Sequence, residues 1–123
     1  MKSREYFAAV QSSILAAPQV IQSNLSFDEV SETECYLRGT LTLTGGYVLH
    51  IAEYTVTEPE IKRLKYRYHF QTGQDQFIAR WDNAPHHPEI ATHPDHLHTA
   101  AGVKPCVAMD VARALSAALE FME

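Results

Sequence analysis

The chain has 123 residues, of which 46% are hydrophobic and 20% are charged, and its formal net charge is −5. This length supports one domain with a hydrophobic core and excludes two domains of ordinary size, so we expect a single domain over residues 1–123. The negative charge argues against general adhesion to nucleic acid, and no apolar run approaches the roughly 18 residues that span a bilayer.

An amphipathic helix is expected at the start of the chain, over residues 2–17. Apolar residues recur there at three- and four-residue steps, and Pro18 ends the pattern. Polar residues interrupt the apolar stretch that a signal peptide would need, so we expect no secretion. The two cysteines, Cys35 and Cys106, make no disulfide framework, which favours the cytoplasm.

Alternation of apolar and polar residues predicts an antiparallel sheet of four or five strands. A weakly patterned segment over residues 19–27 is consistent with a short edge strand. Clear alternation over residues 34–44 and 47–56, joined by Gly45-Gly46, predicts a hairpin. Strands over residues 61–71 and 76–82 follow, with a turn between them.

The strand over residues 61–71 has one apolar face and one basic face. Its core-facing residues are expected to be Leu64, Tyr66, Tyr68 and Phe70, and its opposite face carries Arg63, Lys65, Arg67 and His69. In the next strand Phe77, Ala79 and Trp81 are expected to face inward, so that Arg80 and Asp82 join the basic face. The charge is segregated accordingly, because residues 28–60 hold seven acids and one base, whereas residues 61–81 hold five bases and one acid.

A loop rich in histidine and proline is expected over residues 80–99. Five of the seven histidines lie between His86 and His98, and three prolines among them prevent a long helix or interior strand. A second helix is expected over residues 107–121. This order of elements predicts an α+β domain in which the N- and C-terminal helices cover one face of the sheet, while the face that carries the bases stays open.

Two chemistries are compatible with so many histidines. His96 and His98 could complete a three-ligand zinc site with His86, His87, His93 or Asp95, although no diagnostic metal spacing is present. Alternatively, imidazoles exchange protons near neutral pH while arginines stabilise charge on a phosphate, and RNA supplies its own 2′-hydroxyl as nucleophile. A basic face that is only solvated would have neither role.

Three short stretches carry a resemblance to a known family. They are Lys65-Tyr66-Arg67-Tyr68-His69, the run from Arg80 to Glu89, and His96-Leu97-His98; Leu37-Arg38-Gly39 and Glu53 fit more loosely. In these stretches the chain resembles the TumE family, small toxin-like components of bacterial toxin–antitoxin operons. The resemblance implies a growth-inhibiting ribonuclease, encoded beside an antitoxin that binds DNA. Asp95 stands where another histidine is expected, which favours a mixed His/Asp site.

We therefore expect a toxin that cleaves RNA without a metal ion or other cofactor. The expected catalytic residues are Arg67 and Arg80 as phosphate clamps, His69 and His86 as acid and base, Asp82 as the residue that orients an imidazole, and His87, His96 and His98 as further candidates. The residues expected to bind substrate are Arg63, Lys65, Tyr68 and Asn83. The alternatives are a non-catalytic module that binds nucleic acid or protein, and a metal-dependent hydrolase. The expected partners are an antitoxin and RNA, with no membrane, and a homodimer is left open.

Overall fold

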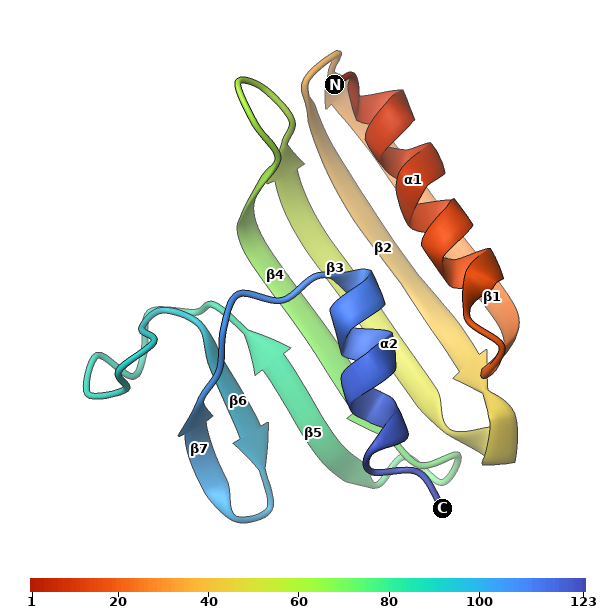
Figure 1. Cartoon of the computed structure of the whole chain (residues 1–123), viewed down its shortest axis with the longest axis vertical. Coiled ribbons are helices and arrows are strands. Elements are labelled where there is room, and N and C mark those ends of the chain that lie inside the picture. The colour runs from red at the N-terminus through yellow and green to blue at the C-terminus, as the bar shows by residue number, and fades with distance from the viewer.

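The computed structural model describes residues 1–123 as one seven-stranded sheet with two α-helices (Figure 1). The elements in chain order are α1 (Ser3–Ala16), β1 (Val20–Ser31), β2 (Glu34–Leu43), the 3₁₀ turn η1 (Thr44–Gly46), β3 (Val48–Val56), β4 (Lys62–Gln71), β5 (Phe77–Asp82), β6 (His96–Thr99), β7 (Gly102–Pro105) and α2 (Val111–Leu119). Each strand pairs antiparallel with the next, so the sheet is a meander. The α+β class is confirmed, but the expected number of four or five strands is wrong.

The two extra strands come from the end of the segment that was expected to be a loop and from the residues after it. β6 pairs with β5, and β7 pairs with β6 at the outer edge of the sheet. Pro94 precedes β6 and Pro105 ends β7, so neither proline removes a hydrogen bond from the interior of the sheet. Residues 83–95 alone connect β5 to β6, and the predicted loop of residues 80–99 is not confirmed in that extent.

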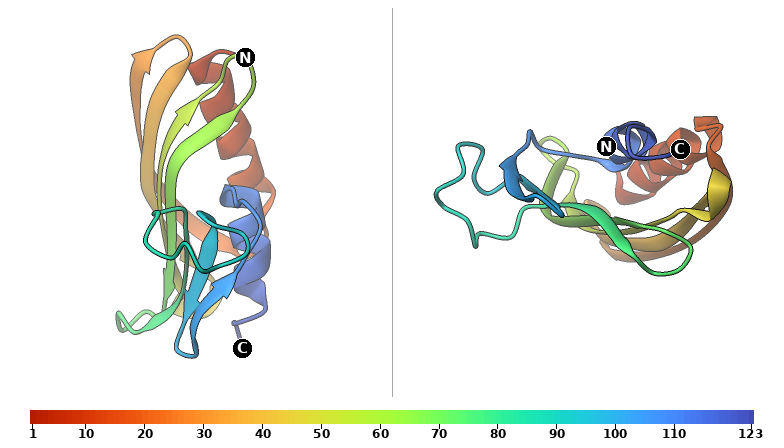
Figure 2. Two further views of the ribbon diagram at one scale, coloured as in Figure 1. Left: turned by 90° about the vertical axis from the view of Figure 1, so that its left-hand side faces the viewer. Right: turned by 90° about the horizontal axis from the view of Figure 1, so that it is seen from below.

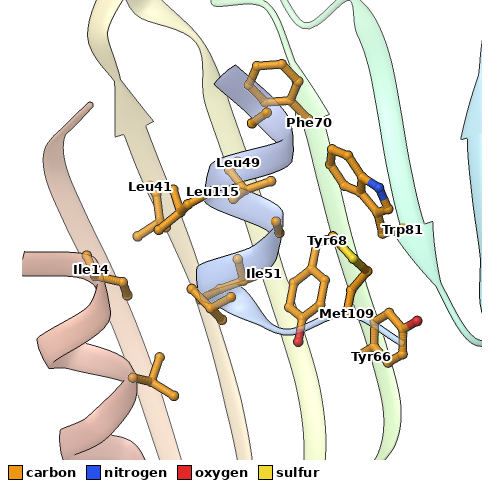
Figure 3. Packing of buried hydrophobic residues seen from close by; sticks show 14 of the residues in the cluster. Ile14, Leu41, Leu49, Ile51, Tyr66, Tyr68, Phe70, Trp81, Met109 and Leu115 are labelled. Atoms are coloured by element: carbon orange, nitrogen blue, oxygen red, sulfur yellow. The ribbon is translucent and has the colours of Figure 1, made fainter. Parts of the chain in front are cut away.

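Both helices lie on the same face of the curved sheet (Figure 2). Apolar side chains from α1, from α2 and from β2 to β5, together with Met109 just before α2, form one core of 19 buried residues. Figure 3 shows part of it, with Tyr68, Phe70 and Trp81 projecting from β4 and β5 toward α2. Neither helix is long and apolar enough to cross a membrane.

α2 is shorter than the helix expected over residues 107–121. It begins after Asp110, whose side chain accepts a hydrogen bond from the backbone N–H of Arg113 at 2.7 Å. This bond satisfies one of the free donors of the first turn, which fixes where the helix starts. Val107 therefore lies outside the helix and is exposed, although the expected helix began at this residue.

A β-bulge in β4 places Arg63 on the face opposite to the predicted one. Tyr54 pairs with Lys65 and Thr55 pairs with Arg63, so Leu64 is left without a partner. One extra residue reverses the facing of the strand beyond it. Arg63 therefore lies on the helix face, with its guanidinium 5.4 Å from the centre of the Tyr6 ring, and Leu64 is exposed.

A second bulge affects the start of β5. The register shifts after Phe70, so Phe77 pairs with Gln71 on the open face. Its ring lies 5.6 Å from that of His69, and the residue is exposed. The expectation that Phe77 faces inward is wrong, whereas Ala79 and Trp81 are buried as predicted.

Candidate functional site

An open pocket of about 360 Å³ lies where β4, β5 and β6 meet the connection over residues 83–95. We call it the histidine pocket; it is lined by Lys65, Tyr66, Arg67, Arg80, Asp82, Asn83, Ala84, His86, His87, His96 and His98. Nine of the twelve residues that the sequence singled out are among them. Arg63, Tyr68 and His69 are not.

The register of the strands brings these side chains together in two rows across the open face. Arg67 lies opposite Asp82, and Asp82 lies opposite His96. In the adjacent row His69 lies opposite Arg80, and Arg80 lies opposite His98. Directly opposed residues point to the same side of a sheet, and neighbouring strands are about 4.8 Å apart, so each row gathers its polar groups at contact distance.

Asp82 is the centre of this arrangement. Its Oδ1 lies 2.9 Å from Nε2 of His96 and accepts a hydrogen bond from the backbone N–H of Ala84 at 3.0 Å. Its Oδ2 accepts a hydrogen bond from Nε of Arg80 at 3.3 Å and lies 3.6 Å from Nε2 of His98. A buried carboxylate needs such partners, because the loss of water is otherwise costly. The contact with two imidazoles fits the orienting role expected for Asp82.

Three imidazoles meet beside Asp82. One ring nitrogen from each of His87, His96 and His98 lies within 4.8 Å of the others. The Nε2 atoms of His96 and His98 are 2.9 Å apart, and Nδ1 of His96 lies 2.8 Å from the backbone oxygen of Pro94. Burial lowers the pKa of His98 below its ordinary value of 6.5, and the nearby charge of Arg80 lowers it further.

Positive side chains form the rest of the pocket wall. Lys65 and Arg67 are exposed on β4, while Arg80 is partly covered and held by Asp82. Arginine offers planar paired donors that match phosphate oxygens. His86 is exposed at the rim of the pocket, and its imidazole makes no hydrogen bond to the rest of the protein.

Asn83 holds the strands together with its side-chain amide. The Oδ1 atom accepts the backbone N–H of Tyr66 at 2.9 Å, and Nδ2 donates to the backbone oxygen of Leu64 at 3.2 Å. These contacts tie the end of β5 to β4 beside the bulge. The expected contact of Asn83 with substrate stays a prediction, and the structure adds this positioning role.

Tyr68 and Arg63 lie on the helix face and do not line the histidine pocket. Tyr68 is fully buried, and its hydroxyl donates to the carboxylate of Glu53. The same carboxylate accepts the Tyr6 hydroxyl and pairs with Nε of Arg63 at 3.5 Å. The expected contacts of Tyr68 and Arg63 with substrate stay predictions that these positions do not support, in the case of Arg63 because of the bulge at Leu64.

His69 lies on the open face but outside the histidine pocket. It lines a neighbouring hollow with His50 of β3, at 6.2 Å between ring centres, together with Arg67 and Gln71. Burial lowers the pKa of His69 below 6.5, and Arg67 and Arg80 lower it further. The expected acid–base pair of His69 with His86 is thus divided between two hollows. His50 was missed by the sequence analysis; its position opposite His69 in the hairpin register was the available signal.

Comparison with known proteins places the whole of this site within one family. The sequence model of a family described as Toxin TumE matches residues 10–123, which include every strand, α2 and all residues of the histidine pocket. No curated protein matches the chain, and no solved structure matches it. Because the match covers nearly the entire chain, the protein belongs to the TumE toxin family.

Proposed function

We propose that this toxin acts by cleaving RNA in the histidine pocket. The observation that supports the proposal is the presence of Lys65, Arg67 and Arg80 in one open pocket with four imidazoles. Positive side chains bind the phosphate backbone of nucleic acid, and imidazoles transfer protons near neutral pH. The proposed place of action is the cytoplasm, where both cysteines, Cys35 and Cys106, would keep the free thiols that they have here.

The pocket contains groups for each step of RNA cleavage by the 2′-hydroxyl. Attack of this hydroxyl on the adjacent phosphorus needs a group that accepts its proton, and loss of the 5′-oxygen needs a proton donor. His86 is exposed and free of protein partners, so it can exchange a proton with a bound RNA. Arg67 and Arg80 can stabilise the charge that develops on the phosphorane. These roles need no metal ion, and a cation held by the neighbouring histidines would add to them.

A binding module without catalysis is the competing function, because the same positive side chains would hold RNA that is never cut. The test uses the full chain and a short single-stranded RNA labelled at one end. We expect the unaltered protein to cleave the RNA. Arg67→Ala should lower the cleavage rate by about a hundredfold to a thousandfold, the usual effect of losing one preorganised contact to developing charge.

His86→Ala should lower the rate by about a hundredfold to ten-thousandfold, as is typical for an acid–base group. Both residues are exposed, so the melting temperature of the variants should stay close to that of the unaltered chain. Arg4→Ala is the matched control, because Arg4 lies on α1 across the sheet from the pocket. RNA that is bound but never cut would support the binding module, and cleavage that is unchanged in both pocket variants would refute the proposed site.

Membership of the family implies an antitoxin partner. We propose that this partner is a DNA-binding protein that lays an acidic or blocking segment over the positive wall of the pocket, and so competes with RNA. The double variant Lys65→Glu with Arg67→Glu should then weaken the binding of both RNA and antitoxin. Calorimetry that finds unchanged antitoxin affinity together with lost RNA binding would exclude direct occlusion.

A further inference from the structure

Three imidazoles of the histidine pocket bring one ring nitrogen each to a common point, and the carboxylate of Asp82 lies beside two of them. His87 comes from the connection after β5, His96 and His98 come from β6, and Asp82 ends β5. The His96 Nε2 atom is 2.9 Å from both Nε2 of His98 and Oδ1 of Asp82. The nitrogens of the three histidines are all within 4.8 Å of one another.

The hydrogen bonds of His96 require a cation at this point. Its Nδ1 lies 2.8 Å from the Pro94 backbone oxygen, which can only accept, so Nδ1 carries a hydrogen. In the neutral ring Nε2 then presents a lone pair, yet it faces a carboxylate oxygen at 2.9 Å. His96 is only 2% exposed, so water does not separate these two acceptors. Either a proton, carried by His96 or by Asp82, or a metal ion must lie between them.

A metal ion accounts for more of the geometry than a proton does. A proton on Nε2 of His96 explains its contact with Asp82, but it gives no reason for the nitrogens of His87 and His98 to converge on the same place. Zinc–nitrogen bonds of about 2.0–2.1 Å set ligand nitrogens roughly 3.3 Å apart in a tetrahedron. The separations between 2.9 and 4.8 Å bracket this value.

The surroundings of His96 also fit a metal ligand. Histidines that bind metals almost always donate their other ring N–H to a carboxylate or a backbone carbonyl, which fixes the ring and the tautomer. The contact from Nδ1 of His96 to Pro94 is such a bond. Three imidazoles form a donor set that suits zinc and neighbouring transition metals rather than magnesium or calcium.

We propose that His87, His96 and His98 bind one divalent transition metal ion beside the carboxylate of Asp82, with zinc as the first candidate. This site goes beyond the proposed function, because its three histidine ligands would hold the ion whether or not RNA is the substrate. It also departs from the metal-independent chemistry that the sequence analysis favours. A bound ion would stand in the same pocket as Arg67, where it could polarise a phosphate oxygen.

The test measures metal binding without RNA. The full-length chain is stripped with a chelator, dialysed and titrated with zinc chloride in a calorimeter, and elemental analysis gives the zinc content after desalting. We expect one zinc per chain. Cobalt(II) added in place of zinc should give the visible absorption of a tetrahedral site.

Two ligand variants and one matched control locate the ion. His87→Ala and His98→Ala alter partly exposed side chains, so they should fold, which circular dichroism checks. Each should weaken zinc binding at least a hundredfold. His93→Ala is the control, because His93 is an exposed histidine of the same connection outside the cluster, and it should bind zinc as the unaltered chain does.

The outcomes separate this site from the proposed function. Failure of the unaltered chain to take up zinc or cobalt would overturn the metal site, and so would equal uptake by His98→Ala and the unaltered chain. RNA cleavage by a chain that takes up neither zinc nor cobalt would overturn the metal site and leave the ribonuclease standing. One zinc per chain without any RNA cleavage would support the metal site and refute the ribonuclease.

Discussion

Replacement of Tyr68 by phenylalanine tests whether this residue serves the fold or the reaction. The Tyr68 hydroxyl lies on the helix face, where it donates to Oε2 of Glu53. Glu53 is 3% exposed and also accepts the hydroxyls of Tyr6 and Thr55. Burial raises the pKa of Tyr68 well above 10, so the hydroxyl keeps its proton and donates at every working pH. Tyr68→Phe removes this donor and leaves the ring in place.

The expected cost follows from the charge of the acceptor. A hydrogen bond to a charged group contributes about 1.5–3 kcal/mol to the free energy of unfolding. At about 4 °C per kcal/mol for a chain of this length, the melting temperature should fall by roughly 6–12 °C. Urea unfolding can be followed by the fluorescence of Trp81, which is the only tryptophan and is buried in the core.

The rate of RNA cleavage per folded molecule should stay unchanged in Tyr68→Phe. Tyr36→Phe serves as the control, because Tyr36 is exposed on β2 and its hydroxyl has no hydrogen bond within the protein, so its free energy of unfolding should change by less than about 0.5 kcal/mol. The reasoning is refuted if Tyr68→Phe unfolds like the unaltered chain while its cleavage rate falls tenfold or more. That result would mean that Tyr68 contacts the substrate after all.

Three further predictions concern the fold. Gly39→Ala places a methyl group 2.6 Å from Cδ2 of Leu25 and 2.7 Å from the Asn24 backbone oxygen, so urea unfolding should show a loss of about 1–3 kcal/mol. Asp110→Ala removes the cap of α2 and should cost about 1 kcal/mol, measured by thermal melting. The pKa of His69 is lowered in the folded state, so the unfolded chain binds a proton at a higher pH than the folded chain does. The free energy of unfolding should therefore fall as the pH drops below 6.5, until the folded-state pKa is reached. His69→Asn should reduce this loss between pH 7 and pH 5; an equally steep loss in the variant would contradict the assignment.

The alternation of half-buried strands made β2 to β5 predictable to within two residues. In a strand with one face on the core and one face open to water, apolar and polar residues alternate along the sequence. β1 was only partly visible, because most of its 12 residues are exposed and carry no apolar period. β6 and β7 were hidden, because each has four residues and their pairing with β5 depends on contacts across the sheet.

The site residues were predictable where strict alternation along a strand decides which face a side chain points to. The prediction failed where a bulge breaks that alternation. Arg67, Arg80 and Asp82 share the open face as their spacing predicts. Arg63 does not share this face, because a bulge at Leu64 reverses its direction. The apolar and polar residues alternate through Leu64 in the sequence, so the pattern does not predict the bulge. The contact of His87 with His96 and His98 depends on the path of residues 83–95. These residues form no helix or strand, so no periodic pattern in the sequence predicts their path.

Two buried carboxylates, one on each face of the sheet, differ in the chemistry that their partners allow. Glu53 faces the helices, and its partners are hydroxyl groups and the guanidinium of Arg63, which hold fixed protons and stay closed off from water. Asp82 faces an open pocket, and two of its partners are imidazoles, which exchange protons or bind metals. A carboxylate that is satisfied only by fixed donors stabilises a fold. A carboxylate that is satisfied by titratable groups beside solvent offsets its burial with contacts that can also serve a reaction. Under the proposed function, the stability of the fold and the activity of the pocket would therefore depend on one set of interactions at Asp82.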